Sequence, residues 1–122
     1  MHVGIDIVEI DRILTAAKRS GKGFMALVYT PKEIKYIGDP EENAGRAAGI
    51  WAAKEAAVKA LGTGFQQGVV FHDLEIEYEE MGRPYIVFAG KFRDLMQASG
   101  LSGSSLSISH CATHAVAAVV LC

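Results

Sequence analysis

The sequence predicts one domain, residues 1–122, that contains both helices and strands. A chain of 122 residues is the length of a single domain. Half of its residues are hydrophobic, which is enough to form a buried core. The spacing of these hydrophobic residues changes along the chain between the period of a strand and the period of a helix. We therefore expect strands and helices to be interspersed within one core.

The composition argues against several classes of partner. Twelve basic and fourteen acidic residues give a net charge of −2, which argues against a general nucleic-acid binder. Cys111 and Cys122 form neither a CxxC pair nor a disulfide framework. The longest apolar run, residues 115–121, is far shorter than the roughly 20 residues that span a bilayer. The first residues also lack a signal-peptide pattern, so we expect a cytoplasmic protein without a membrane partner.

The chain opens with a predicted strand and a predicted helix. Residues 3–8 carry aliphatic side chains at every second position, and this alternation places Asp6 on the face opposite Val3, Ile5 and Ile7. From Asp11 the hydrophobic period becomes helical, and it stops near residue 20. Four basic residues with no acidic residue between them indicate either a basic face or simply a solvated helix surface. They are Arg12, Lys18, Arg19 and Lys22.

Two further helices are predicted in the middle of the chain. Thr30-Pro31-Lys32-Glu33 is a capping box with proline at the first helical position, and this helix is expected to end at Gly38. A longer, alanine-rich helix covers about residues 43–61, with Gly62 as its C-cap.

The second half of the chain is predicted to be mostly strand. Leu, Ile and Tyr alternate with Glu after residue 73, and Gly82-Arg83-Pro84 predicts the turn of a hairpin. A short helix around residues 92–96 and a Gly/Ser loop follow. The expected strands cover residues 74–79, 85–88, 106–110 and 116–121.

Glu55 and Asp6 are the two candidate site residues on apolar elements. A carboxylate on such an element needs a charged or hydrogen-bonding partner, because burying it alone is costly. For Glu55 the structural interpretation is an i,i+4 pair with Lys59, and for Asp6 it is a backbone amide or a helix N-terminus. Alternatively, the two carboxylates share a cation such as Mg²⁺, which commonly takes one or two carboxylates. No His/Cys cluster indicates zinc.

Two other motifs carry weaker signals. Gly62-Thr63-Gly64 follows Lys59 and is compatible with a phosphate-holding loop, although it matches no P-loop pattern and is equally explained as a C-cap and turn. Ser109 and His110 stand at the end of a predicted strand. They lack the GxSxG motif of a serine hydrolase, so a small acyl hydrolase is a minor alternative.

Taken together, these segments resemble the holo-[acyl-carrier-protein] synthases, the short bacterial 4′-phosphopantetheinyl transferases. The matching stretches occur in the family's order and span nearly the whole chain. They are residues 4–7 with Glu9 and Arg12, residues 52–56, Lys59 and Ala60 with residues 62–64, residues 73–76, residues 82–85 and residues 107–110.

The resemblance implies an α+β fold in which an antiparallel sheet packs against a long helix, assembled as a homotrimer with active sites between subunits. It implies Mg²⁺-dependent transfer of 4′-phosphopantetheine from coenzyme A to a serine of apo acyl carrier protein, with release of adenosine 3′,5′-bisphosphate. Asp6 and Glu55 would bind Mg²⁺, and together with Lys59 they would be the catalytic residues. Either Glu55 or a metal-bound water would accept the serine proton.

The resemblance also implies two binding surfaces. The coenzyme would contact Lys59, Gly62, Gly64, Arg83, Pro84, Ser109 and His110. The acyl carrier protein, which is acidic, would dock on the basic face formed by Arg12, Lys18, Arg19 and Lys22, through a salt-dependent attraction.

One departure from the family pattern concerns the coenzyme. Family members commonly have arginine and phenylalanine where this chain has Ile50 and Trp51. An arginine contact to the coenzyme is therefore either missing or supplied elsewhere, for which Arg46 is a candidate. The alternative function is a non-catalytic module that binds coenzyme A or a nucleotide on the same scaffold.

Overall fold

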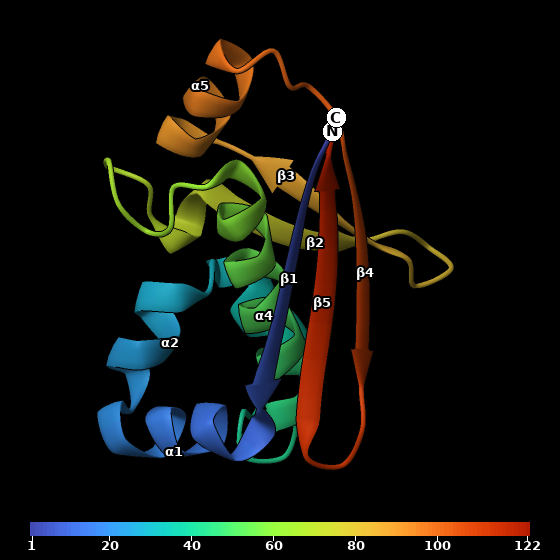
Figure 1. Ribbon diagram of the computed structural model, residues 1–122. Helices are drawn as coiled ribbons and strands as arrows, with labels where there is room; N and C mark the ends of the chain where they lie inside the picture. The colour runs from blue at the N-terminus through green and yellow to red at the C-terminus, as the bar shows by residue number, and fades with distance from the viewer.

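The computed structural model describes residues 1–122, and its centre is a three-stranded antiparallel sheet in the order β1-β5-β4 (Figure 1). A separate antiparallel hairpin of β2 and β3 lies next to β4. The fold is therefore α+β, as predicted. The strands are β1 His2–Glu9, β2 Leu74–Tyr78, β3 Pro84–Phe88, β4 Ser104–His110 and β5 His114–Leu121. The helices are α1 Ile10–Ser20, α2 Lys22–Val28, α3 Pro31–Ile37, α4 Ala44–Leu61 and α5 Gly90–Ala98, with a short 3-10 helix at Phe71–Asp73.

Helix α4 covers one face of the sheet and packs against β1 and β5 (Figure 1). The closest approach is at Gly4, where an added Cβ atom would overlap the carbonyl oxygen of Ala56. Only glycine therefore allows β1 to lie this close to α4. None of the helices is long and apolar enough to cross a membrane.

Strand β1 turns its even-numbered residues toward α4. Gly4 and Val8 are buried there and Asp6 is half-buried. Val3, Ile5 and Ile7 lie on the opposite face, as the alternation predicts, but they are 59–66% exposed. The polar residue therefore faces the helix, and the aliphatic residues face outward.

The outward face of the sheet is a continuous apolar surface. Antiparallel pairing places Val3 beside Val120, Ile5 beside Ala118, and Ile7 beside Val116. The next strand, β4, adds exposed serines to the same rows: Ser105, Ser107 and Ser109. We call the β1 and β5 part of this surface, residues 3, 5, 7, 116, 118 and 120, the outer sheet face.

The two predicted helix ends in the middle of the chain are confirmed. Thr30 accepts a hydrogen bond from the Glu33 amide at 3.3 Å, and Glu33 Oε1 accepts one from the Thr30 amide at 2.8 Å. Gly62 ends α4 in the left-handed conformation, with φ of 86°, and its amide donates to the carbonyl oxygen of Val58. Side chains other than glycine adopt this conformation at a cost.

A fully buried ion pair joins α4 to α3. Lys54 Nζ donates to Glu33 Oε1 at 2.7 Å, and it also donates to the carbonyl oxygens of Val28 and Phe71. The other Glu33 oxygen accepts the amide of Ile76 at 2.7 Å. Burial lowers the pKa of the Lys54 ammonium, and the Glu33 carboxylate opposes that effect.

Helix α2 was not predicted. Its seven residues are too few to show a helical period, and Gly23 lowers their helix propensity. The helix is held by tertiary contacts instead, because Met25 and Val28 are buried and the Val28 carbonyl oxygen is bound by Lys54.

We expect Lys54→Met to lower the free energy of unfolding by about 3–5 kcal/mol, because it leaves the Glu33 carboxylate buried without its counter-charge. Adding Glu33→Gln to this variant should recover part of the loss, since the glutamine amide is neutral and still accepts hydrogen bonds. Urea unfolding of both single variants and the double variant measures the coupling. Strictly additive losses would show that the two charges do not stabilise each other.

Candidate active site

Asp6 and Lys59 form an ion pair where β1 packs against α4, and Glu55 lies one turn before Lys59 on that helix. Lys59 Nζ lies 2.8 Å from Asp6 Oδ1, and it also donates to the carbonyl oxygen of Ile5 at 3.2 Å. Lys59 forms no salt bridge with Glu55, so the i,i+4 interpretation of that pair is wrong. The expected backbone partner of Asp6 is likewise replaced by the lysine.

Glu55 is half-buried beside this ion pair. Burial raises the pKa of its carboxyl group, the nearby Asp6 carboxylate raises it further, and Lys59 lowers it. The two carboxylates are therefore near enough for their charges to interact. Only 13% of the Asp6 side chain is exposed.

The donor set of this region fits Mg²⁺. Two carboxylates supply hard oxygen ligands, and Mg²⁺ commonly takes the rest of its octahedron from water and substrate phosphates. The chain contains no cluster of three or more His, Cys, Asp and Glu residues that would enclose a metal in protein ligands alone. A cation bound by Asp6 and Glu55 would therefore keep open positions.

The predicted glycine loop lies directly after α4. Gly62 and Gly64 both have positive φ, 86° and 58°, and no atom lies near the position where either would carry a Cβ. The C-cap interpretation of Gly62 is confirmed. A phosphate contact at this loop remains a prediction.

A second group of predicted residues lines a cavity of about 250 Å³ between the first turns of α4, the end of β4 and the β2–β3 turn. Pro84 and His110 both line it, and so do Gly45 and Arg46. Arg83 is exposed in the adjoining turn but does not line the cavity. Two tyrosines that the sequence did not indicate, Tyr36 and Tyr78, complete the wall with their rings stacked 4.2 Å apart.

Ser109 lies on the other side of β4 from this cavity. The strand turns Ser109 to the outward face, whereas His110 Cδ2 would lie 3.6 Å from a Cβ atom on Gly45. Adjacent strand residues point to opposite faces, and no hydrogen bond joins the Ser109 hydroxyl to the His110 imidazole, although both residues border a further cavity at the end of β4. The acyl hydrolase alternative therefore has no support.

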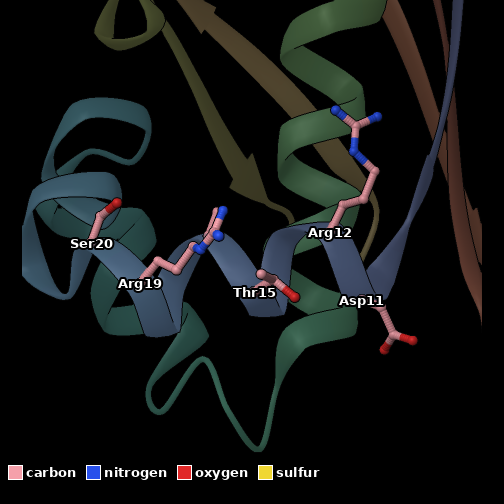
Figure 2. A pocket seen from close by; sticks show the side chains of 6 residues that line it. Asp11, Arg12, Thr15, Arg19 and Ser20 are labelled. Atoms are coloured by element: carbon pink, nitrogen blue, oxygen red, sulfur yellow. The ribbon is translucent and has the colours of Figure 1, made fainter.

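The predicted basic face on α1 divides into separate parts. Arg12 and Arg19 extend to the same side of the helix and line a hollow of about 480 Å³, and Asp11, which also lines it, points away from both guanidinium groups (Figure 2). Lys18 instead lies 3.7 Å from Glu41. Lys22 lines a different groove, between α1, α2 and the loop after α3.

Comparison with known proteins identifies the family. A family model described as the 4′-phosphopantetheinyl transferase superfamily matches residues 2–119. The chain belongs to this superfamily. The family predicted from the sequence motifs, and with it the prediction of a transferase, is confirmed.

Relatives in this superfamily match almost the whole chain. The holo-[acyl-carrier-protein] synthase of Verminephrobacter eiseniae is 47% identical over 99% of this chain and 92% of its own length. That of Koribacter versatilis is 46% identical over 99% of this chain and 97% of its own length. The crystal structure of the Helicobacter pylori synthase in complex with coenzyme A is 33% identical and has a TM-score of 0.86, covering 98% of this chain and 99% of that one.

We expect Glu55→Gln to stabilise the metal-free protein above neutral pH. A carboxyl group whose pKa is raised by folding binds its proton more tightly in the folded chain. It therefore stabilises the fold below its unfolded pKa, and this contribution is lost as the pH rises through the folded value. The melting temperature in EDTA should rise by about 2–4 °C at pH 8, allowing for solvent screening of a half-buried group.

Thermal melts of the variant and wild type between pH 4 and pH 8 test this expectation. The difference in melting temperature between Glu55→Gln and wild type should shrink as the pH falls toward 4.5, the ordinary pKa of glutamate. Glu80→Gln, at an exposed position, should melt at the same temperature as wild type throughout. A variant that is less stable than wild type at pH 8 would contradict the electrostatic account.

Proposed function

We propose that this chain transfers 4′-phosphopantetheine from coenzyme A to a serine of apo acyl carrier protein and releases adenosine 3′,5′-bisphosphate. The observation that carries the proposal is the Asp6–Lys59 ion pair with Glu55 half-buried nearby, in a chain that matches the transferase superfamily over residues 2–119. These three residues come from the motifs on which the family resemblance rests. Relatives with the same full-length match are named for this activity.

In this proposal Asp6 and Glu55 hold Mg²⁺, which when bound neutralises charge on the transferred phosphate. Lys59 donates to a phosphate oxygen of the coenzyme. It is suited to this role because its ammonium group is half-exposed and already lies beside the carboxylates. Phosphoryl-type transfer depends mainly on such positioning and charge stabilisation.

The attacking serine must lose a proton, and Glu55 is the residue best placed to accept it. In the metal-free chain its raised pKa makes it a stronger base than an ordinary glutamate, and a metal-bound water is the alternative acceptor. Asp6 raises the Glu55 pKa by its charge, and its own carboxylate is paired with Lys59.

The proposal includes a homotrimer with active sites between subunits. The outer sheet face supports this assembly, because exposed aliphatic rows on a sheet are characteristic of an interaction surface. The position of the coenzyme residues gives further support. Glu55 follows Arg46 by nine residues, which places it roughly 180° around α4 and about 13 Å along it. One coenzyme molecule would therefore reach the carboxylates of one subunit and the His110 cavity of another.

Acyl carrier protein docks on α1 in this proposal, at the hollow between Arg12 and Arg19. The two guanidinium groups point the same way and have no carboxylate partner. Each guanidinium group presents a pair of N–H donors that matches the two oxygens of one carboxylate, so an acidic helix is a suitable partner. Lys18 is less available because Glu41 lies beside it.

We expect Asp6→Asn and Glu55→Gln each to reduce the turnover rate by about a thousandfold, which corresponds to about 4 kcal/mol of lost transition-state stabilisation. The assay measures the mass gain of apo acyl carrier protein with coenzyme A, with and without Mg²⁺. Asp94→Asn, at an exposed position on α5, is the matched control and should remain fully active. Full Mg²⁺-dependent activity in either site variant would refute the metal assignment, and coenzyme binding without product from wild type would favour the non-catalytic module.

We expect Arg12→Glu to raise the KM for acyl carrier protein about tenfold or more while changing the KM for coenzyme A less than twofold, since only the protein substrate loses its charged contact. Lys91→Glu on α5 makes the same charge reversal at a remote exposed position and should change neither value. Steady-state kinetics at two salt concentrations make the comparison. An equal rise in both KM values would show that α1 does not dock the carrier protein.

A further inference from the structure

Gly4 lies at the contact between the two elements that carry the proposed metal ligands (Figure 1). It is buried on the face of β1 that packs against α4, and Asp6 stands two residues further along the same face. A Cβ atom at Gly4 would overlap the carbonyl oxygen of Ala56 and would lie 2.7 Å from the amide nitrogen of Ala60. Real Cβ atoms keep at least 3.0 Å from such neighbours, so a side chain here would force β1 and α4 apart.

The atoms that meet Gly4 are unable to move aside. Both belong to the backbone of α4, where the hydrogen bonds of the helix hold them, so no side-chain rotation would relieve the overlap. The helix surface at this contact is already made of small, buried residues: Ala52, Ala56 and Ala60. Gly4 therefore sets how closely the strand approaches the helix.

The proposed metal ligands depend on this separation. Asp6 is only about 7 Å from Gly4 along the strand, so a displacement of the strand at Gly4 would carry Asp6 with it. Its partners Glu55 and Lys59 are fixed to the helix on the other side of the contact. The long, half-exposed side chain of Lys59, now 2.8 Å from Asp6, can follow a small displacement. The shorter Glu55 side chain has less reach.

We propose that Gly4 is a positioning residue, which sets the separation of the Asp6 and Glu55 carboxylates so that they fit Mg²⁺ rather than a larger cation. The proposal rests on the proposed function for the role of these carboxylates as metal ligands. Mg²⁺ demands oxygens at about 2.0–2.1 Å in a near-ideal octahedron, whereas Ca²⁺ accepts oxygens at about 2.3–2.6 Å in a flexible geometry. A site widened at Gly4 therefore loses Mg²⁺ before it loses Ca²⁺.

The variant Gly4→Ala tests this role through metal binding, measured without coenzyme and without catalysis. NMR titrations of the isotope-labelled full chain with magnesium chloride and with calcium chloride give a Kd for each ion. We expect Gly4→Ala to weaken Mg²⁺ binding about tenfold or more and Ca²⁺ binding less than threefold, because only the smaller ion requires the close spacing.

A matched control and a compensating variant separate positioning from a general loss of stability. Gly90→Ala is the control, because its Cβ atom would overlap the Asp73 carboxylate on elements that carry none of the site residues. It should lower the melting temperature and leave both Kd values unchanged. Adding Asp6→Glu to Gly4→Ala lengthens the displaced side chain by one methylene group and should recover part of the Mg²⁺ binding. Asp6→Glu alone should weaken it.

If Gly4→Ala is too unstable to titrate, Glu55→Asp shortens the other carboxylate side chain by one methylene group and leaves the Gly4 contact intact. It should lower the preference for Mg²⁺ over Ca²⁺ in the same way. An equal loss of both ions in Gly4→Ala, an unchanged preference in Gly4→Ala or, where it is used, in Glu55→Asp, would overturn the proposal.

Transfer assays with apo acyl carrier protein distinguish this result from a failure of the proposed function. Wild type that transfers with Mg²⁺, together with a Gly4→Ala variant that keeps the wild-type ion preference, refutes the role of Gly4 alone. Wild type that transfers nothing, yet loses its Mg²⁺ preference through Gly4→Ala, refutes the transferase function and supports the positioning role.

Discussion

The ammonium group of Lys54 lies in the interior without contact with solvent and connects three segments that are far apart in the sequence. It binds Glu33 at the start of α3, the end of α2 and the 3-10 helix before β2. Such a group fixes the rotation of α4, because a buried charge has no second arrangement that satisfies it. With α4 fixed in this way, Lys59 reaches Asp6 on β1, and Glu55 lies near enough for its charge to interact with that of Asp6.

Bringing the carboxylates of Asp6 and Glu55 near each other is electrostatically unfavourable. Asp6 and Glu55 repel each other in a region that is partly removed from water, and the single ammonium of Lys59 offsets only part of that repulsion. A fold selected for stability alone would replace one of these carboxylates. A bound cation, as proposed above, would relieve this repulsion.

Local sequence rules predicted the parts of this fold that depend on neighbouring residues. The capping box at Thr30, the left-handed C-cap at Gly62 and the alternation around Asp6 are each fixed by a few adjacent positions. Contacts between distant positions were not predictable in this way. Helix α2 and the Lys54–Glu33 pair depend on tertiary packing, and the spacing of Glu55 and Lys59 suggested a pair that the lysine makes with Asp6 instead. The motifs indicated candidate site residues, but only the folded chain shows that Asp6 and Lys59 form an ion pair.

The central claim is that Asp6 and Glu55 bind one divalent ion together with the coenzyme. A crystal structure with Mn²⁺ in place of Mg²⁺ and with coenzyme A, analysed by the anomalous scattering of manganese, tests this claim most directly. The account predicts one anomalous peak in contact with oxygens of both carboxylates and of the coenzyme diphosphate. An anomalous peak that contacts neither carboxylate would contradict this claim. So would a structure in which coenzyme A is bound, Lys59 and Asp6 keep their ion pair, and no manganese lies beside them.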